Sequence, residues 1–291
     1  MGKNHKRRSA VTQRAARARP GSLIVIGGGE DKERDMLILR QVAARVNSGA
    51  LAVATVATRL ANELWSDYEK VFHQLGVRRV VHLAVENREE AVIQDKVHVL
   101  DNVNVVFFTG GDQLKITSKL GGTRIHDRIQ EIYNSGGTIA GTSAGASVLS
   151  ETMLVSGPGN ETNRVGQDLF MAPGFGFAKD MIIDQHFAER GRIGRLLGAV
   201  ARNPRLLGVG IDEDTAIVID GKEQFQVIGS GGVYVLDGHG VNFTNISEEE
   251  SGRAISIFGI RLDVLSQGDL FDIKTRQPSS RFASSIDARQ N

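Results

Sequence analysis

The chain has 291 residues, of which 41% are hydrophobic and 24% are charged. This is the usual composition of a globular protein, and it excludes the collagen-like and intrinsically disordered classes. The 35 Lys and Arg residues against 34 Asp and Glu residues give a net charge of +1, which provides no overall field to attract nucleic acid or an acidic membrane. Seven of the basic residues and no acid lie in residues 1–20, so the rest of the chain is mildly acidic.

The chain contains no cysteine, which excludes disulfides, thiolate metal sites and a cysteine nucleophile. The first 20 residues lack the apolar core of a signal peptide, and no apolar run approaches the roughly 18 residues of a membrane span. We therefore expect a soluble cytoplasmic protein that makes no membrane contact. The sequence indicates no cofactor and no metal.

Polar segments without apolar periodicity flank the expected folded body. We interpret residues 1–20 as a disordered basic tail, 276–291 as a flexible C-terminal tail, and 21–275 as a single α/β domain. The domain opens with an unbroken apolar run at 23–26, three glycines at 27–29 and a helical pattern to about residue 46. The same strand, turn and helix unit recurs, with strands expected at 51–56, 80–85 and 103–108 and helices at 61–75, 89–100 and about 113–134.

Short apolar strands that alternate with helices predict a parallel sheet covered by helices on both faces. The expected fold is thus a doubly wound, mostly parallel α/β sheet of the flavodoxin-like kind. After about residue 205 the pattern changes to short strands separated by turns, at 207–211, 215–219, 224–228 and 233–236. We expect these strands to extend the sheet as antiparallel hairpins.

The most specific motif is Gly-Thr-Ser-Ala-Gly at residues 141–145, between an apolar strand and an apolar helix start. It fits the G-x-S-x-G pattern, in which tiny neighbours let a nucleophilic serine sit on a strained turn. The pattern predicts Ser143 as the nucleophile, and the backbone N–H of Ala144 as an oxyanion donor at the helix start. The alternative is a plain glycine-rich helix start.

A nucleophilic serine needs a base within hydrogen-bonding reach, and the chain has seven histidines. His186 ends an apolar run that turns polar at its carboxyl end, where open α/β sheets place their sites. His239 lies in a Gly-rich segment typical of a hairpin turn. We therefore favour His186 as the base.

The third member should be a held carboxylate that orients the imidazole and stabilises its cation. Residues 212–214 supply Asp212, Glu213 and Asp214 between two apolar strands, and the sequence pattern alone does not choose among them. The order of serine, histidine and acid differs from the serine, acid, histidine order of α/β-hydrolases, which disfavours an ordinary esterase.

Two further segments are candidate binding elements. Gly110 and Gly111 follow the strand at 103–108, and the N–H of Gly111 is a candidate second oxyanion donor. Three arginines, Arg190, Arg192 and Arg195, follow His186 and offer planar forks for carboxylates. The alternatives are a plain strand-to-helix turn for the glycines and a solvated helix start for the arginines. The glycines at 27–29 do not form a dinucleotide motif, because Lys32 stands where its last glycine belongs.

Together with residues 110–113, 184–187 and 210–215, the serine motif resembles the cyanophycinase family, which shares a serine-peptidase group with aspartyl dipeptidase E. The resemblance covers roughly residues 21–270. It implies a fold similar to class I glutamine amidotransferases and selects Glu213 as the acid, which gives Ser143, His186 and Glu213 as the catalytic residues.

The resemblance also implies the substrate. Cyanophycinases are exopeptidases that release β-aspartyl-arginine dipeptides from cyanophycin, a polyaspartate whose side chains carry arginine. Its carboxylates suit arginine forks and its guanidinium groups suit a carboxylate. By resemblance the substrate-binding residues would be Gln113, Asp184, Gln185, Arg190, Arg192 and Arg195. We also expect a homodimer.

Three alternatives remain open at this point. An aspartyl dipeptidase or another isopeptidase on the same scaffold would cleave free dipeptides but no polymer. A catalytically silent binding protein would have little use for a complete set of serine, histidine and acid. A nucleic-acid protein would use the basic tail, and its binding would fall steeply with salt; the acidic body disfavours that reading.

Overall fold

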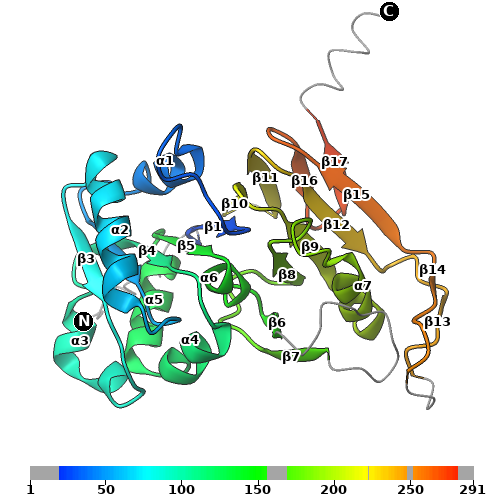
Figure 1. The fold of residues 1–291 in the computed structure, drawn as a ribbon, viewed down its shortest axis with the longest axis horizontal. Coiled ribbons are helices and arrows are strands. Elements are labelled where there is room, and N and C mark those ends of the chain that lie inside the picture. Colours follow the sequence, from blue (N-terminus) through cyan, green and yellow to red (C-terminus); the bar gives the residue numbers. More distant parts are fainter. Residues whose placement is uncertain (1–19, 156–168, 222, 248–251, 281–291) are drawn as a thin grey trace, which may run out of the picture.

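The computed structural model describes residues 20–155, 169–221, 223–247 and 252–280 (Figure 1). Its central sheet has nine strands in the order β17-β16-β11-β10-β1-β5-β4-β2-β3. Strands β1 to β5 are parallel, and β10, β11, β16 and β17 continue the sheet in antiparallel pairs. The strands are β1 (Ser22–Ile26), β2 (Ala50–Ala54), β3 (Val80–Leu83), β4 (Val103–Phe108), β5 (Thr138–Thr142), β10 (Thr215–Asp220), β11 (Gln224–Gly229), β16 (Leu270–Asp272) and β17 (Gln277–Ser279).

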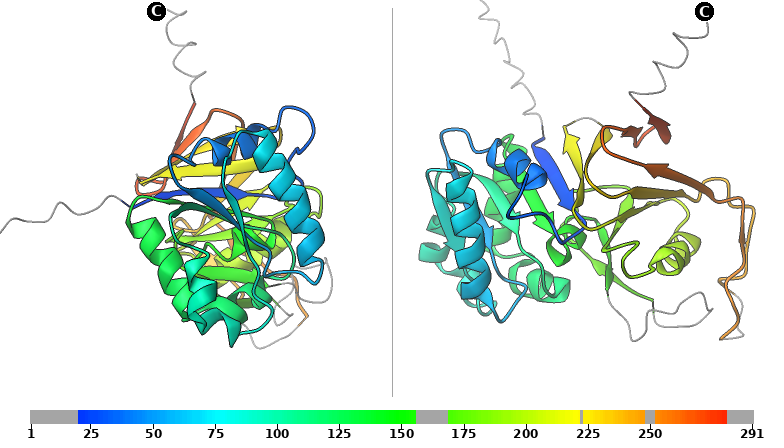
Figure 2. Two further views of the ribbon diagram at one scale, coloured as in Figure 1. Left: turned by 90° about the vertical axis from the view of Figure 1, so that its left-hand side faces the viewer. Right: turned by 45° about the horizontal axis from the view of Figure 1, so that its top comes forward.

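Helices cover both faces of this sheet (Figure 2). Leu23 and Val25 of β1 belong to one apolar cluster, whereas Ile24 and Ile26 belong to the other. Because both faces are buried, the strand is an unbroken apolar run. One cluster contains α4 and α5, and the other contains α1 and α2. The helices are α1 (Leu37–Ala43), α2 (Ala61–Gln74), η1 (Glu90–Val92), α3 (Gln94–His98), α4 (Gln113–Leu120) and α5 (Arg124–Asn134). The predicted doubly wound α/β sheet with an antiparallel C-terminal extension is confirmed.

Three of the predicted helices differ from the structure. The helix expected directly after the glycine turn begins only at Leu37, because Asp31 accepts backbone N–H groups from residues 33, 34 and 36 and holds the chain in a loop. The helix expected at 113–134 is interrupted at Gly121 and Gly122: Gly121 leaves the helical conformation with ψ 123°, and Gly122 follows with φ +68°. The segment expected as a helix at 89–100 is a short 3-10 turn followed by α3.

A second sheet contains four strands in the order β15-β12-β9-β8, with helix α7 (Ile193–Arg202) packed against it. Its strands are β8 (Met181–Gln185), β9 (Leu207–Ile211), β12 (Val233–Asp237) and β15 (Arg261–Leu265). The prediction that all the strands after residue 205 extend one sheet is therefore wrong for β9 and β12. The chain crosses from the second sheet to the central one in the turn between β9 and β10. Periodicity detects a strand but does not choose its non-local partner.

The remaining elements are short. Helix α6 (Ala144–Ser147) follows β5, while β6 (Thr152–Val155) pairs with β7 (Phe170–Pro173) and β13 (Phe243–Thr244) with β14 (Ile257–Phe258). Within the described residues, no helix is both long and apolar enough to cross a membrane.

Our prediction places the start of the C-terminal tail too early. Strand β17, within the predicted tail, pairs with β16 at the edge of the central sheet. The guanidinium of Arg276 supports this segment by donating to the carboxylate of Asp237 at 2.6 Å. Residues 1–19, which hold nearly all of the predicted basic tail, and residues 281–291 lie outside the described residues.

Candidate active site

Ser143 lies at a sharp turn between β5 and α6. Its backbone has φ +53° and ψ −115°, a conformation that costs a residue with a side chain on the order of 1–3 kcal/mol. The flanking glycines are required by close packing. A Cβ on Gly141 would lie 2.1 Å from the carbonyl oxygen of Gly145, and one on Gly145 would lie 2.3 Å from that of Phe108. The turn therefore requires glycine at positions 141 and 145.

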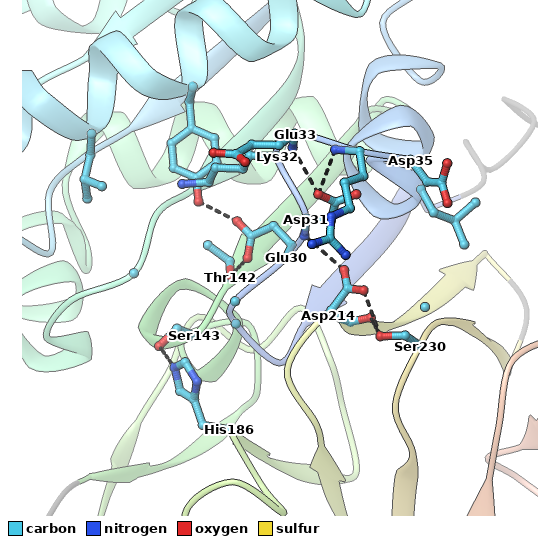
Figure 3. Close-up of a pocket in the computed structure, with 18 of the residues that line it drawn as sticks. Glu30, Asp31, Lys32, Glu33, Asp35, Thr142, Ser143, His186, Asp214 and Ser230 are labelled. Atoms are coloured by element: carbon cyan, nitrogen blue, oxygen red, sulfur yellow. Dashed lines mark hydrogen bonds between the residues drawn. The ribbon is translucent and has the colours of Figure 1, made fainter.

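His186 is the histidine that approaches Ser143. Its Nε2 lies 2.8 Å from Ser143 Oγ and its Nδ1 lies 2.6 Å from Glu213 Oε1. The three side chains come from different places: Ser143 from the central sheet, His186 from the end of β8 in the second sheet, and Glu213 from the turn that joins the sheets. Figure 3 shows the contact between Ser143 and His186. His239 instead lies after β12, beside Asp237 and largely exposed.

The three neighbouring acids of the β9–β10 turn have different partners. Asp212 accepts backbone N–H groups of Ala188 and Gly232, at 2.9 and 3.0 Å. Asp214 accepts the N–H of Asp31 and the hydroxyl of Ser230. Of the three acids, only Glu213 contacts the imidazole of His186. The distances thus distinguish residues that sequence periodicity could not.

The glycine turn at 27–29 packs against the histidine and the acid. A Cβ on Gly28 would lie 2.3 Å from His186 Cε1, and a Cβ on Gly29 would lie 2.8 Å from Glu213 Oε2. Both glycines also have positive φ, at +105° and +58°. In sequence this turn stands out only because it does not complete a dinucleotide motif. Its position after β1, a neighbour of β5, was the available signal for a role beside Ser143.

The two backbone groups expected to stabilise an oxyanion lie next to Ser143. A Cβ on Gly110 would lie 3.4 Å from that of Ser143, which places the turn after β4 in van der Waals contact with the serine. Within the described part of the chain, the N–H groups of Gly111 and Ala144 donate to no other group. They are available to a negative oxygen.

The residues predicted to bind substrate divide into two groups. Asp184 is fully buried; Arg195 Nε donates to its Oδ2 at 2.9 Å, and Arg192 Nη1 and Arg195 Nη2 donate to its Oδ1. Arg192 Nη1 also donates to Gln185 Oε1, at 3.0 Å. Burial lowers the pKa of Arg192 to about 10. Asp184 is therefore an internal counter-ion in this structure, not an open acceptor for a substrate guanidinium.

The other two predicted substrate residues have separate settings. Gln113 is buried at the start of α4, and its side-chain amide donates to the carbonyl of Leu154 at 2.8 Å. Arg190 is exposed, and its one hydrogen bond to a described residue runs from its backbone N–H to the carbonyl of His186. Of the three arginines, Arg190 is the one whose side chain faces solvent.

A pocket of about 1350 Å³ opens onto Ser143 and His186 (Figure 3). One wall is the loop between β1 and α1, which sequence analysis did not single out. Five acids and two bases line the pocket: Glu30, Asp31, Glu33, Asp35 and Asp214, with Lys32 and Arg34. The excess of acids favours a cationic group within it.

Comparison with known proteins decides the family. Residues 23–227 match the family model described as Peptidase family S51. The chain belongs to this family. It is a serine-type peptidase, as the motif at residues 141–145 predicted.

Proteins named cyanophycinase are similar to this chain over most of its length. Those of Synechococcus elongatus and Geminocystis herdmanii (strain PCC 6308) are each 35% identical over 261 residues, which is 88% of this chain and 80% and 95% of theirs. That of Nostoc sp. (strain PCC 7120) is 35% identical over 271 residues, 92% of this chain and 90% of its own. The predicted resemblance to the cyanophycinase family is confirmed.

A solved structure supports the fold. The crystal structure of a peptidase from an acI-B1 Actinobacterium aligns with a TM-score of 0.66 over 88% of this chain and 98% of that one, at 22% identity. That peptidase and this chain thus share one α/β architecture.

Proposed function

We propose that this S51 peptidase is a cyanophycinase, a serine exopeptidase that releases β-aspartyl-arginine dipeptides from cyanophycin. The observation that carries the proposal is the continuous line of hydrogen bonds from Ser143 through His186 to Glu213, at 2.8 and 2.6 Å. The name of the relatives supplies the substrate, since family members 35% identical over 88% of the chain are cyanophycinases.

The geometry supports acyl transfer in two steps. His186 Nε2 accepts the proton of Ser143 Oγ as the oxygen attacks the scissile carbonyl carbon, and Glu213 stabilises the imidazolium through Nδ1–H. The N–H groups of Gly111 and Ala144 bind the carbonyl oxygen as it becomes negative. Collapse of this intermediate breaks the peptide bond, and His186 returns the proton to the leaving amine. Water then attacks the acyl-enzyme with His186 again as the base, which regenerates Ser143.

We assign substrate contacts on both sides of Ser143. Arg190, Arg192 and Arg195, with Gln113 and Gln185, bind the polymer on the β8 side, where arginine forks match carboxylates. Asp184 contributes by fixing two of these guanidinium groups, both of which donate to its carboxylate. The acid-lined pocket on the β1 side receives an arginine side chain of the polymer.

The direct test is incubation of the full chain with insoluble cyanophycin, with mass spectrometry of the soluble fraction. We expect β-aspartyl-arginine as the main product and none from Ser143→Ala. Cleavage of free β-aspartyl dipeptides without release from the polymer would instead identify an aspartyl dipeptidase or another isopeptidase. If neither substrate is hydrolysed, the result would instead indicate a catalytically silent binding protein. The homodimer and the cytoplasmic location stay predictions, and sedimentation of the purified chain tests the first.

A further inference from the structure

A buried acid that the proposed chemistry does not use stands beside the nucleophile turn. Glu30 follows the glycine turn after β1, and 6% of its surface is exposed. Both of its carboxylate oxygens accept a hydrogen bond: Oε2 from the hydroxyl of Thr142 at 2.6 Å, and Oε1 from the hydroxyl of Tyr68. Figure 3 shows the carboxylate of Glu30 beside Thr142. Thr142 is the last residue of β5 and directly precedes Ser143.

A buried carboxylate is costly unless its oxygens are satisfied, so its place here calls for a reason. The two hydroxyl donors lie at different oxygens of Glu30. A carboxylate has two acceptor oxygens, whereas a side-chain amide has one acceptor oxygen and one NH2 donor. Tyr68 remains a donor, because burial and the nearby Glu30 raise its pKa well above the usual value. The Lys32 ammonium lies 4.0 Å from the centre of the Tyr68 ring, where it makes a cation–π contact.

The bond to Thr142 acts where the backbone is strained. Ser143 has φ +53°, and its N–H donates to the carbonyl of Ile26 at the end of β1. Glu30 lies four residues beyond Ile26, so β1 and the residues after it contact the turn twice: Ile26 through the backbone of Ser143, and Glu30 through the side chain of Thr142. Strained residues persist only when their surroundings over-determine them.

We propose that Glu30 is a positioning residue for Ser143, which it holds in attack geometry through Thr142, with Tyr68 fixing the carboxylate. The inference rests on the proposed serine nucleophile but not on the polymer substrate. It predicts a loss in the reactivity of Ser143 itself, whatever acyl group is offered.

The test measures labelling of Ser143 by an alkyl fluorophosphonate, a small probe that reports the serine without the substrate subsites, alongside kcat and KM for cyanophycin. For Glu30→Gln we expect labelling and kcat to fall about tenfold to a hundredfold, as for loss of a hydrogen bond to a charged group, with KM little changed. Glu30→Asp keeps the charge but is one methylene shorter and does not reach both hydroxyls, so we expect a similar loss. Glu69→Gln, next to Tyr68 on α2, removes the same charge without touching Thr142 and should react like the parent.

Variants of Thr142 test the route. Thr142→Val removes the hydroxyl and should reproduce the loss, whereas Thr142→Ser keeps it and should restore most of the rate. In the double variant of Glu30→Gln and Thr142→Val, the two losses should not add, since both remove one contact. Thermal melts of every variant identify any that fail to fold.

Several results would overturn the inference: Glu30→Asp reacting like the parent, since charge alone would then matter; Thr142→Ser as slow as Thr142→Val; or additive losses in the double variant. A parent that is labelled at Ser143 but spares cyanophycin would contradict the proposed substrate and leave the inference standing. A parent that is not labelled at all would contradict both.

Discussion

Two clusters of polar side chains share strand β8 and differ in what they leave unsatisfied. Asp184 lies within the strand, fully buried, with both oxygens engaged by Arg192 and Arg195. His186 lies two residues further on, after the strand, and joins Ser143 to Glu213 at the edge of a pocket. Both resemble functional charge clusters in the sequence. Only the second combines a strained nucleophile, unpaired N–H groups and access to solvent.

The difference teaches that charge density does not distinguish a reactive site from a structural one. The buried carboxylate of Asp184 is paired with the guanidinium groups of Arg192 and Arg195, as a buried charge must be. The line through His186 instead ends on a hydroxyl that faces a pocket. We therefore expect substitutions at the second cluster to abolish turnover with the fold intact, and substitutions at the first to act on stability.

The largest effect should come from the nucleophile and base. Ser143→Ala removes the hydroxyl without adding bulk to the turn, so we expect turnover to fall by about 10⁴ or more, with an unchanged melting temperature. His186→Ala should behave alike, because among the described residues His186 is the base that lies 2.8 Å from Ser143 Oγ. Initial rates with cyanophycin measure both. His239→Ala is the matched control, and a large loss there would show that the base is misassigned.

The acid provides the next test. Glu213→Gln should lower turnover by roughly 10³ to 10⁴, because the amide no longer stabilises the imidazolium. Asp212→Asn and Asp214→Asn should chiefly lower the melting temperature, since those carboxylates accept backbone N–H groups. Paired rate and melting measurements on the three variants separate the roles. Equal activity losses in all three variants would contradict the assignment of Glu213 as the acid that stabilises the imidazolium of His186.

The sequence predicted the nucleophile turn well because its requirements are local. G-x-S-x-G describes packing within five residues, as the 2.1 Å approach to Gly141 illustrates. Strands β1 and β2 were also predictable, since burial on both faces makes residues 23–26 and 50–54 unbroken apolar runs. The assignment of β9 and β12 to a second sheet was not, because it depends on non-local pairing.

The same limit explains which contacts around the site the sequence does not show. Nothing local in the sequence shows that Arg192 and Arg195 donate to Asp184, which lies eight and eleven residues earlier. Glu30 escaped notice for a similar reason: its partner Thr142 is 112 residues away. The choice of Glu213 over its neighbours came from the family resemblance and not from the pattern of acids.

The Asp184 cluster is tested through stability. Asp184→Asn leaves two arginines without their counter-ion, so we expect the free energy of unfolding to fall by about 3 to 5 kcal/mol. Urea unfolding measures it. Arg190→Lys, at the exposed arginine of the same segment, should leave the unfolding curve unchanged. If Asp184→Asn were as stable as the parent but failed to bind cyanophycin, the carboxylate would belong with the substrate after all.

The smallest expected effect concerns Asp31, an acid of the pocket whose carboxylate accepts hydrogen bonds from backbone N–H groups. N–H groups of Met36, Arg34 and Glu33 donate to the Asp31 carboxylate and lower its pKa from 3.8 to about 2. A carboxyl whose pKa is lower in the folded state stabilises the protein above its unfolded pKa, and this contribution disappears as the pH falls through the folded value. It is therefore complete above about pH 4 and lost toward pH 2.

Asp31→Ala should accordingly lower the melting temperature by a few degrees at pH 7, and the gap to the parent should close as the pH falls from 4 toward 2. Asp35→Ala is the matched control: it lies in the same loop, and its carboxylate accepts no hydrogen bond from any of the residues that the structure describes. Because this effect belongs to the loop and not to the reacting atoms, it should appear equally in the inactive Ser143→Ala background. A gap that stayed constant down to pH 2 would mean that Asp31 stabilises the loop through packing, and its ionised carboxylate would then have no part in shaping the pocket wall.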